Sequence, residues 1–218
     1  MIEEDFFWAG YCQGVAIGNV KKQNTYRWGT LEDSNTEKKG ALYSIFDTGA
    51  SSLMIGQMYY DSLITKIMEK VPDVKWSYQR DYRVRTECSA DYPSIFFMFD
   101  GNWLEVSPHD YIFEQEDGET CILLIMPVET PMNMLGMPIF LDYYTIHDPE
   151  SGKIGWAPHT GSEKDTVVSG PLPPKYQVLE VRSLPVPPTE PIDWISILVS
   201  WTFTSGLIYL SFLGWNKW

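Results

Sequence analysis

Cysteine, histidine and basic residues are scarce in this chain of 218 residues. Its three cysteines form no CxxC pair, and its three histidines are scattered singly. The sequence therefore predicts no metal site, and nothing in it indicates a cofactor. Sixteen basic against 29 acidic residues give a formal net charge of −13, which argues against a nucleic-acid partner. The acidic excess fits a protein of an acidic compartment as well as an ordinary soluble surface.

Long apolar runs are also rare, with one exception near the C-terminal end. Residues 194–215 carry no formal charge. A helix of that length would be about 33 Å long, which matches a hydrocarbon core of about 30 Å. We therefore predict a transmembrane helix over residues 192–216 and a cytosolic tail over residues 217–218. A buried or interfacial terminal helix is the alternative, because the run contains several serine and threonine residues.

The composition changes ahead of this run. Residues 161–191 contain seven prolines and few large apolar residues, which is typical of an extended, polyproline-biased stalk. Residues 1–160 mix short stretches of Val, Ile, Phe, Tyr and Trp with turn residues and predict a mainly β domain. We expect one helix, over residues 56–69, and a surface hairpin or insertion over residues 21–40. Strands are predicted over residues 11–20, 42–46, 94–99, 103–106, 111–114, 121–127, 140–147 and 153–157.

Residues 41–56 carry the most informative pattern, ALYSIFDTGASSLMIG. An apolar strand leads into Asp47, and an ionisable group there is costly to bury unless backbone and hydroxyl donors surround it. Gly49 lets the backbone turn close beneath the carboxylate. This arrangement is what a catalytic carboxylate needs.

The pattern resembles the C-terminal lobe of the pepsin-like aspartic proteases. The predicted helix follows the DTG loop as it does in that lobe. Four further segments, PSIFFMF, VSPHDYI, MLG with PIFLDYY, and HD with KIGWA, then follow in the order of the lobe. They lie at residues 93–99, 106–112, 134–144 and 147–157. The resemblance covers about residues 5–160 and implies a pepsin-like fold for the domain at residues 1–160.

The resemblance also implies roles in the loop. Asp47 would be one of two aspartates that share a proton, activate a water molecule and hydrolyse a peptide bond at acidic pH. Thr48, Gly49 and Ser51 would support the catalytic loop, and Thr48 would also contact the loop of the opposite lobe. Ala50 stands where the lobe usually has a hydroxyl residue, and this change should alter the pKa of the aspartate pair.

Structural roles follow from the same resemblance. Three residues would pack beneath the Asp47 loop without taking part in the chemistry: Met134, Leu135 and Gly136. Cys88 and Cys121 would form the disulfide of the lobe. Cys12 is left over, either as a buried free thiol or paired with a cysteine outside this chain.

The sequence contains the motif for only one of the two aspartates that such a site needs. Each lobe of a two-lobed enzyme supplies one aspartate, and the only DTG or DSG triplet in the sequence is at Asp47. The chain alone should therefore be inactive. One prediction is a membrane-anchored aspartic endopeptidase that acts on peptides or proteins and is completed by an N-terminal lobe on another chain or a missing segment. A symmetric homodimer is a second possibility, and a non-catalytic lobe that serves as a structural or accessory subunit of a membrane-associated assembly is a third.

The location of the domain depends on how the chain is inserted. Residues 1–8 are acidic and then aromatic, which does not fit a signal peptide. If a longer precursor carries the signal, the chain is a single-pass type I membrane protein with a lumenal or extracellular domain. If the C-terminal helix alone inserts, the protein is tail-anchored and the domain is cytosolic.

Overall fold

The structure, a computed structural model, describes residues 7–29, 40–162, 164, 167–173 and 176–185. All of them belong to the first of two units, Met1–Pro187 and Pro188–Trp218. The predicted transmembrane helix over residues 192–216 and the tail after it lie outside the described residues. Within the described part of the chain, every helix is too short or too polar to span a bilayer.

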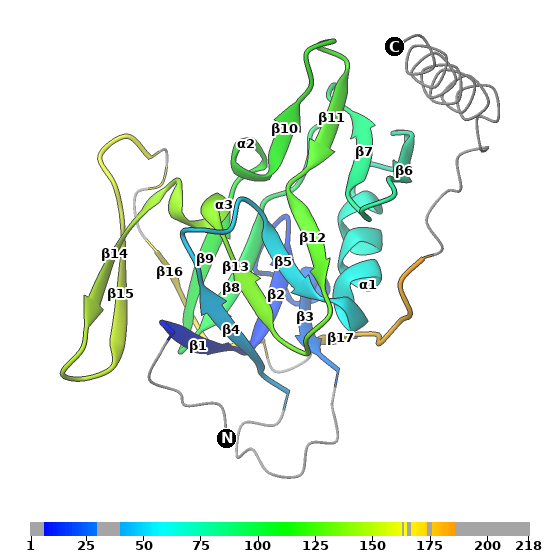
Figure 1. The fold of residues 1–218 in the computed structure, drawn as a ribbon. Coiled ribbons are helices and arrows are strands. Elements are labelled where there is room, and N and C mark those ends of the chain that lie inside the picture. Colours follow the sequence, from blue (N-terminus) through cyan, green and yellow to red (C-terminus); the bar gives the residue numbers. More distant parts are fainter. Residues whose placement is uncertain (1–6, 30–39, 163, 165–166, 174–175, 186–218) are drawn as a thin grey trace, which may run out of the picture. The chain divides into compact units, whose positions relative to one another are not determined.

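The loop that carries Asp47 connects two strands of a five-stranded sheet. In order across the sheet, the strands are β1 (Ala9–Cys12), β4 (Leu42–Phe46), β13 (Asn133–Leu135), β5 (Leu53–Gly56) and β12 (Ile125–Val128). Strand β13 lies between β4 and β5, parallel to the first and antiparallel to the second. The buried Asn133 amide donates to the Ser44 hydroxyl at 3.2 Å and accepts from the Gly56 N–H at 3.3 Å. A strand from much later in the chain therefore fixes both ends of the loop (Figure 1).

A six-stranded sheet contributes the other half of the core. Its strands are, in order, β16 (Val168–Ser169), β9 (Asn102–Val106), β8 (Ile95–Phe99), β2 (Gly14–Ile17), β3 (Thr25–Trp28) and β17 (Gln177–Leu179). Buried residues of both sheets form one hydrophobic cluster with helix α1 (Gln57–Met68). Helix α1 packs against β5, β12 and β17, at the side of the domain opposite β14 and β15 in Figure 1.

Two smaller sheets and three short helices make up the rest of the secondary structure among the described residues of the domain. The four-stranded sheet contains β10 (Ile112–Glu114), β11 (Thr120–Leu123), β7 (Val84–Glu87) and β6 (Trp76–Tyr78). Strands β14 (Tyr143–Asp148) and β15 (Lys153–Pro158) form a separate hairpin. The short helices are η2 (Lys22–Asn24), α2 (Pro108–Tyr111) and α3 (Met137–Phe140). The predicted mainly β fold is confirmed, and α1 lies within its predicted range.

Two predicted strands begin later than expected because short helices take their first residues. Helix α2 occupies the start of the predicted strand over residues 111–114, and the backbone N–H of Ser107 donates to the Asp110 carboxylate at 2.9 Å. Helix α3 has Pro138 in its first turn, where a missing N–H costs nothing. Strand β14 therefore begins at Tyr143 instead of residue 140.

The prediction of a surface hairpin or insertion over residues 21–40 is wrong for Thr25–Trp28, which form a strand of the core. Strand β3 pairs antiparallel with β2, and its Tyr26 and Trp28 side chains are buried in the core. This strand is hard to predict from the sequence, because it is short and follows two lysines and further polar residues. Residues 30–39 lie outside the described residues.

The prediction of an extended stalk over residues 161–191 is also wrong where the structure describes this segment, because the segment pairs with the domain. Strand β16 pairs with β9, and β17 pairs in parallel with β3, so this segment adds one strand to each edge of the six-stranded sheet. Leu179 is buried in the main core. Prolines are compatible with edge strands, because an edge leaves one side of the backbone without a ladder partner.

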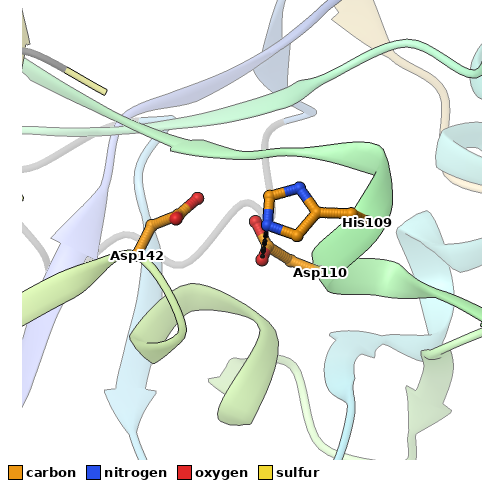
Figure 2. Close-up of side chains that lie close together, drawn as sticks. All are labelled: His109, Asp110 and Asp142. Carbon is orange, nitrogen blue, oxygen red and sulfur yellow. Dashed lines mark ion pairs between the residues drawn. The ribbon is translucent and has the colours of Figure 1, made fainter. Parts of the chain in front are cut away.

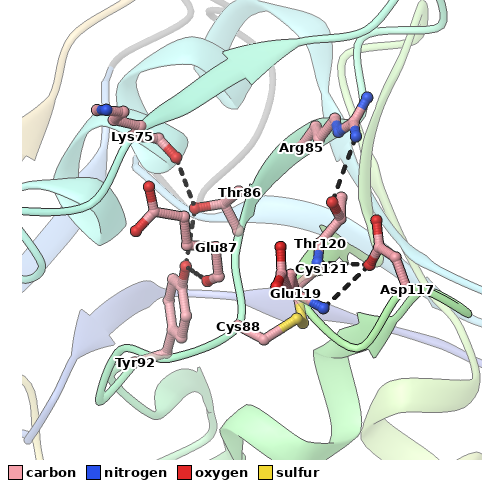
Figure 3. The surroundings of a disulfide bond; sticks show 10 residues. All are labelled: Lys75, Arg85, Thr86, Glu87, Cys88, Tyr92, Asp117, Glu119, Thr120 and Cys121. Carbon is pink, nitrogen blue, oxygen red and sulfur yellow. Dashed lines mark hydrogen bonds between the residues drawn. A yellow bond between two sulfur atoms is a disulfide. The ribbon is translucent and has the colours of Figure 1, made fainter.

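The disulfide between Cys88 and Cys121 is confirmed, with the two Cα atoms 5.1 Å apart (Figure 3). It joins the end of β7 to β11, two strands that already pair in the four-stranded sheet. Beside it, the Tyr92 hydroxyl donates to the Glu87 carbonyl at 2.6 Å, and the Thr120 N–H donates to Asp117 at 2.7 Å. The bond therefore strengthens a sheet whose Val84 and Leu123 side chains are buried in the main core.

We expect the double substitution Cys88→Ala and Cys121→Ala to lower the free energy of unfolding by about 3–4 kcal/mol, because the unfolded chain regains the entropy of an open loop. Urea unfolding without reductant measures the loss. As a control, dithiothreitol should destabilise the unaltered chain by a similar amount and leave the double variant unchanged. Equal stability of the two proteins without reductant would contradict a stabilising role for the bond.

Candidate functional site

Asp47 is the first residue after strand β4, and the loop itself holds its carboxylate. The Asp47 N–H donates to the Leu135 carbonyl at 3.0 Å, which continues the pairing of β4 with β13 beyond the strand. The Gly49 N–H donates to Asp47 Oδ1 at 2.8 Å. Asp47 is half-buried, whereas Thr48 and Gly49 are exposed. The carboxylate is therefore oriented by the loop and accessible at the surface of the domain.

The segment predicted to lie beneath this loop does contact it. The Met137 N–H donates to the Ala50 carbonyl at 2.7 Å. A Cβ atom at Gly136 would lie 2.4 Å from the carbonyl oxygens of both Ala50 and Ser52, so only glycine allows this close approach. The end of β13 and the residues after it thus contact the Asp47 loop, and the packing role of Met134, Leu135 and Gly136 stays a prediction.

The other predicted residues of the loop differ in their surroundings. Ser51 is exposed, whereas its neighbour Ser52 is buried. Among the residues that the structure describes, the Gly49 N–H is the hydrogen-bond partner of the Asp47 carboxylate. The catalytic roles of Asp47, Thr48, Gly49 and Ser51 remain predictions.

The β14–β15 hairpin lies beside the Asp47 loop and has two apolar faces. On its inner face, the centres of the Trp156 and Phe46 rings lie 4.8 Å apart, and Phe46 directly precedes Asp47 in the sequence. On its outer face, Tyr144 and Ile146 are each 64% exposed, and they lie opposite Ala157 and Gly155. The hairpin thus exposes two apolar side chains on the face opposite Trp156.

A cluster of charged side chains was not predicted from the sequence. Oxygen or nitrogen atoms of His109, Asp110 and Asp142 lie within 4.8 Å of one another, which would suit a metal ion (Figure 2). However, the Lys164 ammonium contacts the carboxylates of both Asp110 and Asp142. The lysine therefore supplies the cation that two buried carboxylates require. The sequence gives little indication of this cluster, because Lys164 lies within the segment that reads as a stalk.

Burial changes the pKa values of two members of this charge cluster. It raises the pKa of Asp110 above the ordinary aspartate value, although the Ser107 N–H and the neighbouring His109 and Lys164 act in the opposite direction. It lowers the pKa of Lys164 below the ordinary lysine value, with Asp110 and Glu105 opposing the shift. Both shifts have the sign expected when a charged group loses its hydration.

Cys12 is a free, fully buried cysteine, as one of the two predicted alternatives expects. Its thiol donates to the Gly14 carbonyl at 3.3 Å. Burial raises its pKa to about 12, so the thiolate required for disulfide exchange is disfavoured. Cys12 is therefore part of the core.

The sequence matches known proteins over the same region that forms the folded domain. Residues 11–159 match the sequence model of the eukaryotic aspartyl protease family. Cathepsin D of Mus musculus is 28% identical over 126 residues, which are 55% of this chain and 30% of the cathepsin. Pepsin A of Sus scrofa is 30% identical over 134 residues, 59% of this chain and 33% of the pepsin. Aspartic proteinase 39 of Arabidopsis thaliana is 27% identical over 137 residues, 58% of this chain and 29% of the proteinase. The match thus spans about a third of each relative.

We expect Gly136→Ala to destabilise the domain by about 2–3 kcal/mol, because the added methyl group forces the Asp47 loop away from β13. Urea unfolding at neutral pH measures this change. Gly155→Ala is the matched control, because its Cβ atom would lie 3.5 Å from the nearest atom, Ile146 Cβ. Similar effects of the two substitutions would show that the loop is not tightly held at Gly136.

Proposed function

The chain belongs to the eukaryotic aspartyl protease family, and we propose that it is the C-terminal-type lobe of an aspartic endopeptidase. Asp47 is one catalytic aspartate of this enzyme, and a second lobe supplies the other. The observation that carries the proposal is how the Asp47 side chain is oriented and how far it is exposed. Its carboxylate is oriented by the Gly49 N–H, and it is left accessible beside exposed Thr48 and Gly49.

The chemistry follows from placing a second carboxylate opposite this one. Two carboxyl groups about 3 Å apart do not both ionise, so the pair holds one proton over an acidic pH range. The ionised member takes a proton from a water molecule, which attacks the carbonyl carbon of a peptide bond. The protonated member donates to the carbonyl oxygen as negative charge develops there. The substrates of this reaction are peptides or proteins.

The second lobe would dock beside the loop, on the β14–β15 hairpin. Tyr144 and Ile146 present a contiguous apolar face there, next to the inner Trp156 that packs on Phe46. A partner that covers this face would bury apolar surface and place its own loop near Asp47. The short match to relatives supports a missing lobe, because the aligned region is about a third of their length.

The alternative function is that of a non-catalytic lobe that serves as a structural or accessory subunit of a membrane-associated assembly. Ala50 supports this alternative, because its side chain has no hydroxyl group to donate to the aspartate pair. The same exposed face of β14 would then hold a partner that lacks an aspartate loop.

Asp47→Asn should reduce proteolysis by at least about a thousandfold, because the pair loses the carboxylate that activates water. The test uses the tagged full chain, expressed in its own host and recovered together with any bound chain, with casein as substrate at pH 4. Asp73→Asn, at an exposed aspartate, is the matched control and should retain activity. An unaltered complex that does not cleave casein would favour the accessory subunit, and cleavage by Asp47→Asn would refute the assigned role.

We also propose that residues 192–216 anchor the protein in a membrane with the domain on the lumenal or extracellular side. The support is the uncharged run of residues 194–215 and the acid chemistry expected at Asp47. In sealed vesicles, added protease should leave the domain intact until detergent is added, and Cys88 and Cys121 should be oxidised. Digestion of the domain without detergent would instead place it in the cytosol, as expected for a tail-anchored protein.

A further inference from the structure

Lys164 lies beyond residue 159, where the match to the family ends, yet its side chain is only 7% exposed. Its ammonium donates to the Ser107 hydroxyl at 2.8 Å and lies 3.8 Å from Asp110 Oδ2. It also contacts the Asp142 carboxylate, and the side chains of the two aspartates are 0% and 5% exposed. One ammonium therefore holds together the start of α2 and the residues after α3.

The segment that follows Lys164 is bound to the domain at several points, so the lysine does not hold it alone. The Trp103 indole N–H donates to the Gly170 carbonyl at 3.2 Å, and the Gly170 N–H donates to the Gly101 carbonyl at 2.8 Å. Farther on, β17 pairs with β3, and the Arg182 N–H donates to the Met58 carbonyl at 2.9 Å. We call the described residues of this segment, 164, 167–173 and 176–182, the strap.

A short series of contacts connects Lys164 to the Asp47 loop. Asp142 follows α3 by two residues, and its carbonyl accepts from the His159 N–H at 3.1 Å. At the other end of α3, the Met137 N–H donates to the Ala50 carbonyl at 2.7 Å. Since α3 is a single turn, fixing its C-terminal end also limits the movement of its N-terminal end.

We propose that Lys164 is a positioning residue for the Asp47 loop, acting through Asp142 and helix α3. Its effect on catalysis rests on the proposed protease function, but its effect on the geometry of the loop does not. The strap thus makes the position of the loop depend on a segment outside the family domain.

The charges that face Lys164 make this contact dependent on pH. Asp110 and Asp142 are two carboxylates for one ammonium, and His109 Nε2 lies 2.9 Å from Asp110 Oδ1. Glu105 of β9 adds a further negative charge nearby, and the Tyr143 ring of β14 lies 5.5 Å from the ammonium. Uptake of a proton at Asp110 reduces the excess negative charge of the cluster.

The direction of the pH effect follows from the pKa of Asp110, which burial raises. The protonated form is then favoured in the folded protein, so the stabilisation is present at acidic pH and decreases as pH rises through the folded pKa. Burial lowers the pKa of Lys164, and Asp110 and Glu105 oppose that shift. Lys164 in turn acts to lower the pKa of Asp110, so its own contact with Asp110 is strongest when that carboxyl is ionised.

The test is amide hydrogen exchange of the full chain, read at the Met137 N–H. Lys164→Met should increase the exchange rate of this amide by at least tenfold at pH 5, because Asp142 loses its cation and α3 is released. Lys164→Arg should restore most of the protection. Arg182→Gln is a matched control, since it removes a strap cation whose partners, Asp61 and Glu180, lie away from the charge cluster.

A general loss of stability must be distinguished from local release of the loop. Leu179→Ala creates a cavity where β17 enters the core, and it should raise exchange across the six-stranded sheet. If Leu179→Ala or Arg182→Gln increases exchange at Met137 as much as Lys164→Met does, the positioning role is refuted. The same holds if Lys164→Met leaves Met137 unchanged.

These readings are independent of proteolysis. If the recovered complex cleaves no casein but Met137 responds as described, the protease proposal fails and the positioning role stands. If casein is cleaved and Lys164→Met changes neither exchange nor the pH profile of cleavage, the positioning role fails and the protease proposal stands.

Discussion

The structure depends on the insertion of β13 between β4 and β5. The Asp47 loop connects these two strands, and neither strand pairs directly with the other. Without β13, the loop would join two strands that lack a common partner. Asn133 bonds to both sides, and Gly136 allows the loop carbonyls to approach the backbone that follows β13. The position of Asp47 is thus decided by residues more than eighty positions later in the sequence.

The Asp47 loop is held on one side by the backbone that follows and includes the end of β13, through the Leu135 carbonyl and the Met137 N–H. Asp47 itself is only half-buried. A second lobe docked at Asp47 would exclude water and place two carboxyl groups close enough to share a proton. The exposed apolar residues Tyr144 and Ile146 lie on the hairpin whose Trp156 packs on Phe46, so the proposed lobe would complete the site as it docks there.

The strap and the charge cluster connect this loop to the remainder of the chain. Burying Asp110, Asp142 and Lys164 is expensive, since each loses its hydration, and the cost is acceptable only where the charges satisfy one another. Each charge of the cluster is stabilised by the opposite charge beside it, so removing one member leaves another buried charge without its partner.

The sequence alone determined the mainly β class, helix α1, the DTG loop and, through resemblance, the Cys88–Cys121 pair. These features are local patterns or short motifs in a known order. Strand β3, the pairing of β16 and β17 with sheet edges, and the Lys164 cluster were decided by tertiary structure. Their residues are polar, proline-rich or widely separated, and only the folded chain supplies the partners that make burial of such residues favourable.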